Sequence, residues 1–160
     1  MLDKDDIQPE DVFQVLESIH FKKDQPRNNV SAAKVQGFCL GTTGVYSAGM
    51  VVSNATLQRR RLTKFLVKYC EQNNPDFKFS CIQVNKDVKC DLHIDGNNLG
   101  PTLIIGIGDY EPIQSPTTIC EYYGGHLWIQ GRGPVDVKNK WENFDGNIPH
   151  GTITPYAGTR

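Results

Sequence analysis

The sequence predicts an α+β fold in which helices come first and an all-β core follows. Apolar residues recur at helical spacing in two stretches of the first 76 residues. From residue 77 onward the chain changes to short β-rich runs separated by glycine-bearing turns, with no helical stretch between them. Parallel βαβ units need intervening helices, so the second pattern favours a barrel or jelly roll, with the helices packed on one outer face.

Two helices are expected in the first part of the chain. Pro9 and the acidic residues after it mark the start of the first helix, which should end near Lys22. Ser53 or Asn54 caps a longer second helix that continues to about Glu71. The apolar stripe of this second helix consists of Leu62, Phe65, Leu66 and Tyr69.

The other face of the second helix is basic. Two interpretations stay open: an ordinary solvated helix face, or a face that contacts phosphates of a nucleic acid. The basic residues are Arg59, Arg60, Lys64 and Lys68.

The predicted strands are short. Two of them, over residues 35–40 and 45–52, precede the second helix, with a turn at 41–44, and a polar loop covers residues 24–33. The strands predicted for the second part cover residues 77–84, 92–94, 102–107, 127–130, 141–144 and 148–154. We therefore expect one domain over 1–160, with residues 1–76 as helical and strand support and residues 77–160 as the β core.

Composition excludes several classes of protein. A net charge of −1 on 160 residues exerts no overall attraction toward nucleic acid or membrane. No apolar run approaches the length of a membrane span, and the N-terminus is acidic, so an intracellular protein, cytoplasmic or nuclear, is expected. Five cysteines without a Cys-x-x-Cys pair indicate buried thiols rather than a disulfide framework or zinc ribbon.

The segment Asp-Leu-His-Ile-Asp at residues 91–95 is the candidate metal-binding stretch. On an extended segment, residues two apart face the same side, so His93 and Asp95 point together while Leu92 and Ile94 should anchor the opposite face. A histidine and a carboxylate are two ligands of the 2-His-1-carboxylate iron triad. His150 is the candidate for the third.

Arg160 adds a guanidinium ten residues beyond His150. Its planar fork suits the distal carboxylate of a dicarboxylic cosubstrate. Together the motifs resemble the Fe(II)/2-oxoglutarate-dependent dioxygenases, whose catalytic core is a double-stranded β-helix, and the resemblance covers about residues 77–160. The residues that carry it are, in order, Asn85, His93-Ile-Asp95-Gly-Asn-Asn, Gly108-Asp-Tyr110, Gly124-Gly-His-Leu127, His150 and Arg160.

The resemblance implies specific roles. His93, Asp95 and His150 would be the ligands of Fe(II), and Arg160 would bind the C5 carboxylate of 2-oxoglutarate. Asn85 would also contact 2-oxoglutarate. With O2 as the oxidant, the implied reaction is hydroxylation of a substrate C–H bond with release of succinate and CO2.

Two departures from the family pattern stand out. In the family, the Gly-Asp-Tyr and Gly-Gly-x-Leu motifs usually adjoin, whereas here residues 111–123 separate them. This segment could be a loop over the substrate mouth, a surface insertion or an error in the coding sequence. The family also continues with a strand that carries the arginine. Because residue 160 is the last of this sequence, we expect the β core to be incomplete at its C-terminus.

Several functions remain open within and beyond the resemblance. The His-x-Asp-x-x-Asn and Gly-Asp-Tyr motifs are closer to TET/JBP-like nucleobase oxygenases, which makes nucleic acid a candidate partner. A protein or prolyl hydroxylase is an alternative, although that group typically uses lysine where Arg160 stands here. The third possibility is a non-catalytic, cupin-like binding module. The substrate and the oligomeric state are left undetermined.

Four further residues were assigned roles. Tyr110 should be a packing residue, and His126 should lie on the surface of a strand. In iron sites of this kind the second ring nitrogen of each histidine ligand is held by an acceptor. Asp145 and Asn147 were the candidates for that acceptor.

Overall fold

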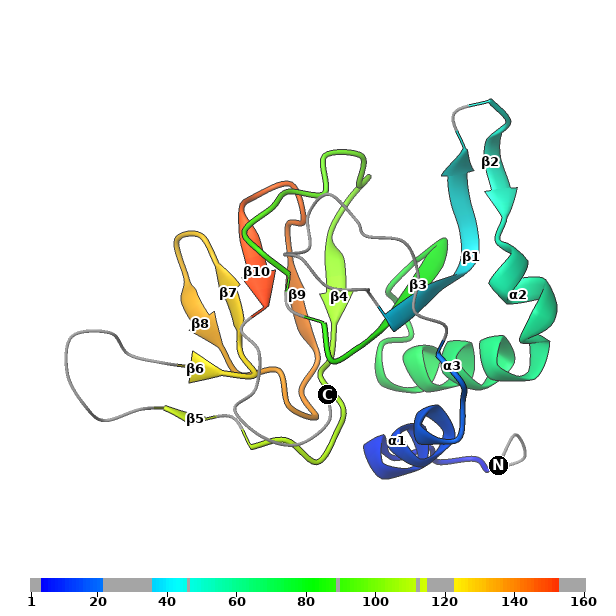
Figure 1. The fold of residues 1–160 in the computed structure, drawn as a ribbon, viewed down its shortest axis with the longest axis horizontal. Coiled ribbons are helices and arrows are strands. Elements are labelled where there is room, and N and C mark those ends of the chain that lie inside the picture. Colours follow the sequence, from blue (N-terminus) through cyan, green and yellow to red (C-terminus); the bar gives the residue numbers. More distant parts are fainter. Residues whose placement is uncertain are drawn as a thin grey trace. The chain divides into compact units, whose positions relative to one another are not determined.

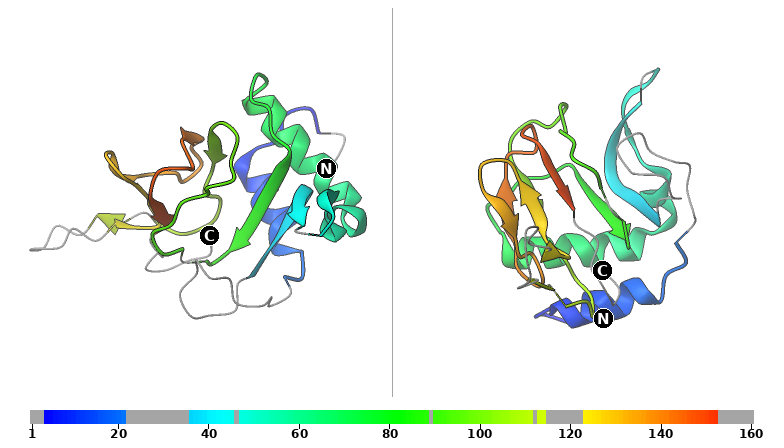
Figure 2. Two further views of the ribbon diagram at one scale, coloured as in Figure 1. Left: turned by 90° about the horizontal axis from the view of Figure 1, so that it is seen from above. Right: turned by 60° about the vertical axis from the view of Figure 1, so that its left-hand side comes forward.

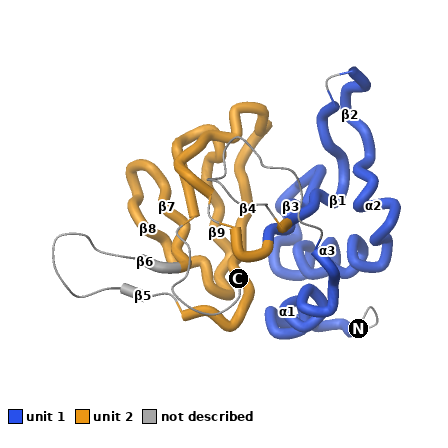
Figure 3. The backbone as a smooth tube through the Cα atoms, in the orientation of Figure 1, with its two compact units in different colours: residues 1–22, 37–85 blue, residues 23–36, 86–160 orange. Residues whose placement is uncertain are grey.

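The computed structural model describes residues 4–21, 36–45, 47–88, 90–111, 113–114 and 123–152 (Figure 1, Figure 2). Helices and small antiparallel sheets are mixed in the order α1 Pro9–Glu17, β1 Gln36–Val45, β2 Gly49–Val52, α2 Asn54–Gln58, α3 Arg60–Asn73, β3 Cys81–Lys86, β4 Thr102–Ile104, β5 Ile113–Gln114, β6 Tyr123–Gly124, β7 Leu127–Ile129, β8 Gly133–Val135, β9 Glu142–Phe144 and β10 His150–Thr152. The chain divides into two compact units, residues 1–22 with 37–85 and residues 23–36 with 86–160 (Figure 3).

The predicted second helix of the first unit is present but broken at Arg59. Ser53 caps its start, since the Ser53 hydroxyl accepts a hydrogen bond from the backbone N–H of Thr56 at 3.2 Å. Arg59 then leaves the helical conformation with φ −122° and ψ 43°, and the chain restarts as α3. All four residues of the predicted apolar stripe are buried, which confirms that prediction: Leu62, Phe65, Leu66 and Tyr69.

Helix α1 ends at Glu17, earlier than the expected end near Lys22. Its N-terminus is tied to α3 through one amide side chain. Gln72 Oε1 accepts from the backbone N–H of Ile7 at 2.8 Å, and Gln72 Nε2 donates to the Ile7 carbonyl at 3.0 Å. These reciprocal bonds join segments that are far apart in sequence and place buried Ile7 and Val12 in the core of the unit.

The turn predicted at residues 41–44 is wrong. These residues continue β1, and the chain turns back at residues 47–48 into β2. Gly41 is needed inside the strand because β3 lies beside β1 in the order β2-β1-β3 (Figure 2). A Cβ at Gly41 would lie 2.3 Å from the Ser80 carbonyl oxygen, and the φ of +102° is one that L side chains rarely adopt.

The second unit contains short antiparallel sheets ordered β10-β7-β8, β4-β9 and β5-β6. Its buried cluster consists of Leu127, Ile129, Val137 and Phe144, packed against partly buried Ile104, Val135 and Ile148. The sheets do not close into a barrel within the described residues. The double-stranded β-helix, the single domain and the packing of the helices on the β core therefore stay predictions.

Several strand predictions are modified by the structure. The strand expected at 92–94 is reduced to an isolated bridge between His93 and His150. β3, predicted to begin the β core, pairs with β1 and so joins the first unit. β8 was not predicted; it contains Pro134 and lies at a sheet edge, where proline is tolerated.

The segment 111–123, unexplained by the resemblance, has paired ends. Ile113 lies opposite Gly124 and Gln114 opposite Tyr123 in the β5-β6 ladder. No helix in the described part of the chain is both long and apolar enough to cross a membrane. None of the four described cysteines forms a disulfide, and they are partly buried except for exposed Cys81.

Candidate metal centre

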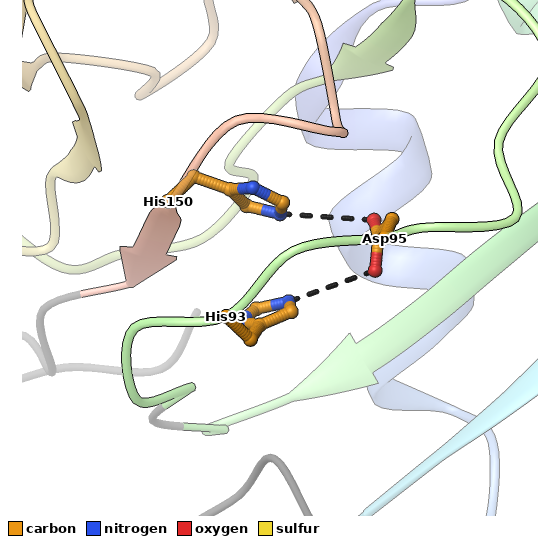
Figure 4. A group of neighbouring side chains, drawn as sticks. All are labelled: His93, Asp95 and His150. Carbon is orange, nitrogen blue, oxygen red and sulfur yellow. Dashed lines mark ion pairs between the residues drawn. The ribbon is translucent and has the colours of Figure 1, made fainter.

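His93, Asp95 and His150 converge in the second unit (Figure 4). His93 Nε2 lies 3.8 Å from Asp95 Oδ1, and His150 Nε2 lies 3.7 Å from Asp95 Oδ2. One ligand atom from each residue lies within 4.8 Å of the others. The two imidazole rings have centroids 4.4 Å apart. This group could hold a metal ion, and it contains all three ligands that the sequence predicted.

Backbone hydrogen bonds between distant segments bring the three residues together. The His93 N–H donates to the His150 carbonyl at 2.9 Å, and the His150 N–H donates to the His93 carbonyl at 3.0 Å. The Asp95 N–H donates to the Gly146 carbonyl at 2.8 Å. Backbone pairing between these segments therefore holds the three residues near one another.

Two glycines allow these segments to approach closely. A Cβ at Gly146 would lie 2.6 Å from Thr102 Oγ1 and 2.8 Å from Asn98 Nδ2. A Cβ at Gly151 would lie 3.0 Å from the Cys90 carbonyl oxygen. The sequence alone does not predict this role for either glycine, although each lies within five residues of a predicted ligand.

Each imidazole is oriented by a carbonyl two residues earlier in the chain. His93 Nδ1 lies 2.7 Å from the Asp91 carbonyl oxygen, and His150 Nδ1 lies 2.9 Å from the Ile148 carbonyl oxygen. Because a carbonyl oxygen only accepts, this geometry assigns the proton to Nδ1 and leaves the Nε2 lone pair directed at the group. Both rings thus present the nitrogen that a metal needs.

The acceptors predicted for the imidazoles, Asp145 and Asn147, are wrong. They bond to each other instead: Asp145 Oδ1 accepts from the backbone N–H of Asn147 at 2.9 Å and from its Nδ2 at 3.0 Å. These two hydrogen bonds, backbone first, hold the pKa of Asp145 below its ordinary value. Their role is to shape the turn that precedes His150.

The donor spacing fits a metal ion better than it fits direct pairing. Distances of 3.7 and 3.8 Å exceed the length of a hydrogen bond. Donors at about 2.1 Å from one ion, on one face of an octahedron, lie about 3.0 Å apart. Small side-chain rotations would bring the donor atoms from these separations to those at a metal ion, because the backbone already directs all three side chains toward one another.

Burial is graded across the group. The side chain of His150 is 6% exposed, that of His93 18% and that of Asp95 38%. The ring of Phe144 lies edge-on to His150 at 4.8 Å between centroids and joins the site to the buried cluster. The histidines are thus held by the protein interior, while solvent and ligands can reach the group beside Asp95.

The structure does not test the roles predicted for the remaining site residues, Asn85 and Arg160. Asn85 lies on β3 in the first unit, where its Oδ1 accepts from Gln83 Nε2 at 2.9 Å. Arg160 lies outside the described residues. Their assignment to 2-oxoglutarate stays a prediction.

Two expectations about neighbouring side chains are wrong. Leu92 and Ile94 do not anchor the far face of the segment, since they are 62% and 54% exposed. Because the segment is held by isolated backbone bonds rather than by a sheet, no layer of described residues covers that face. His126, expected on the surface, is 9% exposed and lies near enough to Asp136 to help lower its pKa. Tyr110 is fully buried, which confirms its packing role.

Comparison with known proteins found no match: no family model, no curated protein and no solved structure resembles the chain significantly.

Proposed function

We propose that this chain is an Fe(II)- and 2-oxoglutarate-dependent dioxygenase that hydroxylates a C–H bond of its substrate, on a double-stranded β-helix core. The observation that carries the proposal is the convergence of His93, Asp95 and His150, with both Nε2 atoms directed at one carboxylate. Two histidines and one carboxylate, with open coordination positions, are typical of non-haem Fe(II) oxygenases.

The chain's own residues would divide the work. His93 and His150, neutral and protonated on Nδ1, hold the metal through Nε2, and Asp95 contributes the negative charge. Arg160 holds the distal carboxylate of 2-oxoglutarate, and Asn85 makes a further contact with it. A metal held there would, with 2-oxoglutarate and O2, supply the oxidising chemistry for the hydroxylation, with succinate and CO2 as the co-products. Buried Phe144 excludes water from the side of His150.

Metal binding is the first test. Purified protein is titrated anaerobically with Fe(II), and with Co(II) as a spectroscopic probe, and binding is followed by calorimetry and by the visible spectrum. We expect His93→Ala and His150→Ala each to weaken binding by about a hundredfold or more, because each removes one of three protein ligands. Asp95→Asn keeps the shape of the side chain and should also weaken binding, since it removes the only charge.

The matched control is His20→Ala, which removes an exposed histidine from the end of the α1 region. Circular dichroism confirms that each variant is folded. Equal metal affinity in the wild type, His93→Ala and His150→Ala would overturn the proposal.

Catalysis is tested separately from binding. Wild-type protein loaded with Fe(II) should convert 2-oxoglutarate to succinate, and the rate should rise with the true substrate. Nucleobases in short oligonucleotides are the first substrates to offer, because the motif order is closest to nucleobase oxygenases; a proline-containing peptide tests the protein hydroxylase alternative. Tight metal binding without succinate would favour the non-catalytic binding module.

A further inference from the structure

An open hollow lies in the first unit, where α2 ends and α3 begins. Its volume is about 380 Å³, within the range of small-molecule sites. It is lined by Ile19, Leu57, Gln58, Arg59, Arg60, Arg61 and Leu62, and we call it the arginine pocket. The helices that form it are labelled in Figure 1.

The helix break explains why three consecutive arginines line one cavity. In a continuous helix, neighbouring residues project about 100° apart and face different directions. At Arg59 the backbone leaves the helical conformation, and its carbonyl oxygen accepts from the N–H of Thr63 at 2.9 Å and from the Thr63 hydroxyl at 3.0 Å. Arg59 lies just outside the helix and Arg60 and Arg61 begin α3, and all three line the hollow at the junction.

Their charges are not neutralised within the described residues. No acidic side chain in the described part of the chain forms an ion pair with these arginines, and the first turn of α3 contains no acidic residue. Lys68, further along the same helix, differs, since it donates to the Lys4 carbonyl at 2.7 Å and lies 3.6 Å from Asp5. The N-terminus of α3 adds partial positive charge to the arginine cluster.

One arginine is fixed and two are free to reach a ligand. The Arg59 guanidinium lies 4.6 Å from the centre of the Phe38 ring, a cation–π contact that orients it. Arg60 and Arg61 are exposed. A preoriented guanidinium beside two adaptable ones suits an anion with several acceptor oxygens, such as a phosphate.

Apart from Gln58, the rest of the pocket wall is apolar. Leu57 is 53% exposed although it is aliphatic, and Ile19 and Leu62 complete the same lining. Apolar wall and guanidinium cluster together match a ligand that carries a phosphate on one side and a flat ring on the other.

We propose that the arginine pocket binds a nucleotide unit, with the phosphate on Arg60 and Arg61 and the base against Leu57. The nucleotide is either free or part of a single-stranded nucleic acid, since both present the same phosphate and ring. The inference concerns the first unit alone and does not depend on the metal group.

Two probes test the proposal at low salt: a mixture of nucleoside monophosphates, followed by calorimetry, and fluorescently labelled single-stranded oligonucleotides of one to six nucleotides, followed by anisotropy. Arg60→Gln with Arg61→Gln should weaken both by about tenfold or more, because charge-assisted contacts to phosphate are lost. The slope of the logarithm of the oligonucleotide binding constant against the logarithm of salt concentration should also become shallower in the double variant, by roughly one for each phosphate contact removed.

The matched control removes two positive charges that lie outside the pocket. Lys4 and Lys78 are exposed residues of the same unit that neither line the cavity nor belong to the basic helix face, so Lys4→Gln with Lys78→Gln should leave affinity within about twofold. Equal losses in both double variants would mean non-specific attraction and would overturn the pocket. Absence of binding by both probes would overturn it as well.

The apolar wall has its own test. Leu57→Ser should weaken nucleotide binding more than binding of inorganic phosphate, because only the nucleotide has a ring to cover Leu57; equal effects overturn the assignment of the base. The same measurements distinguish the two sources of the nucleotide. Affinity that rises steadily with oligonucleotide length identifies a single strand as the ligand. Displacement of the labelled oligonucleotide by nucleoside monophosphates at a concentration similar to that of the oligonucleotide identifies the free nucleotide.

Discussion

The two compact units are stabilised by different kinds of contact. In the first, one amphipathic helix contributes four buried residues along a regular stripe, and Phe38 and Leu40 from β1 are buried with them. In the second, most strands are two or three residues long, and isolated backbone bridges join segments such as 93 with 150 and 106 with 138. Burial along a regular helix face is thus prominent in the first unit, and short ladders and bridges between distant segments are prominent in the second.

This difference separates what sequence patterns can show from what they cannot. A helix face is set by residues three and four apart, so its burial can be predicted from a window of the chain. The bridge between His93 and His150 joins residues far apart in the chain, so it depends on how the intervening segments fold. The ligands of the candidate metal group were predicted, but the bridge that brings His93 beside His150 was not.

The two units can be followed by different signals. Both tryptophans of the chain, Trp128 and Trp141, belong to the second unit, and all described helices belong to the first. Tryptophan fluorescence therefore reports the second unit, while helical circular dichroism at 222 nm reports the first. Variants in either unit can be compared in one urea titration.

The largest effect is expected in the helical core. Phe65 is 3% exposed, so Phe65→Ala should lower the free energy of unfolding by about 3–5 kcal/mol through lost burial and a cavity. The circular dichroism midpoint should fall accordingly. Leu57→Ala, at a 53% exposed position, is the control and should change stability by less than about 0.5 kcal/mol.

A second truncation tests the β core. Leu127 is fully buried, so Leu127→Ala should lower the free energy of unfolding by about 2–5 kcal/mol. The midpoint followed by tryptophan fluorescence should shift more than the midpoint followed by circular dichroism. Leu99→Ala, at an entirely exposed position, should have little effect. If both signals shift by the same amount in Phe65→Ala and in Leu127→Ala, the units unfold as one and the contrast between them is removed.

An intermediate effect is expected where backbones meet beside the metal group. Gly146→Ala places a Cβ within 2.6 Å of Thr102 Oγ1, so it should cost about 1–3 kcal/mol and weaken Co(II) binding by displacing the partner of the Asp95 N–H. Gly96→Ala is the control, because a Cβ there meets nothing within 4 Å. Unchanged metal affinity in Gly146→Ala would show that the close approach does not position Asp95.

The smallest effect is electrostatic. Burial raises the pKa of Asp136. Hydrogen bonds from the Lys140 ammonium at 2.5 Å and the Lys138 N–H at 3.0 Å lower the pKa by more than burial raises it, so the net pKa lies below its ordinary value. The folded state thus binds the proton more weakly than the unfolded chain. The resulting stability is present above about pH 4 and is lost as pH falls through the folded pKa.

Asp136→Asn should therefore reduce stability at pH 7 by less than about 1 kcal/mol, since the pair is partly exposed to solvent. Urea titrations from pH 7 to pH 3 should show the difference from wild type shrinking below about pH 4. Asp76→Asn removes an exposed carboxylate in the first unit and serves as the control. A difference that grows on acidification would contradict the assigned direction of the pKa.

Much of the first unit was predictable because its information is local. The Ser53 cap and the buried stripe of α3 follow from residues within one or two helical turns. The break at Arg59 and the continuation of β1 through Gly41 were missed. Both positions have tertiary partners, the Phe38 ring beside the Arg59 guanidinium and the Ser80 backbone beside Gly41, which no local pattern shows.

By itself, the sequence determined the donor types and placed His93 and Asp95 on one side of an extended segment, because alternation is a property of any extended backbone. Only the tertiary structure decided that His150 lies opposite His93, that carbonyls of Asp91 and Ile148 direct both Nε2 atoms inward, and that Leu92 and Ile94 are exposed. Those features arise from hydrogen bonds between segments distant in the chain, and no local pattern encodes them.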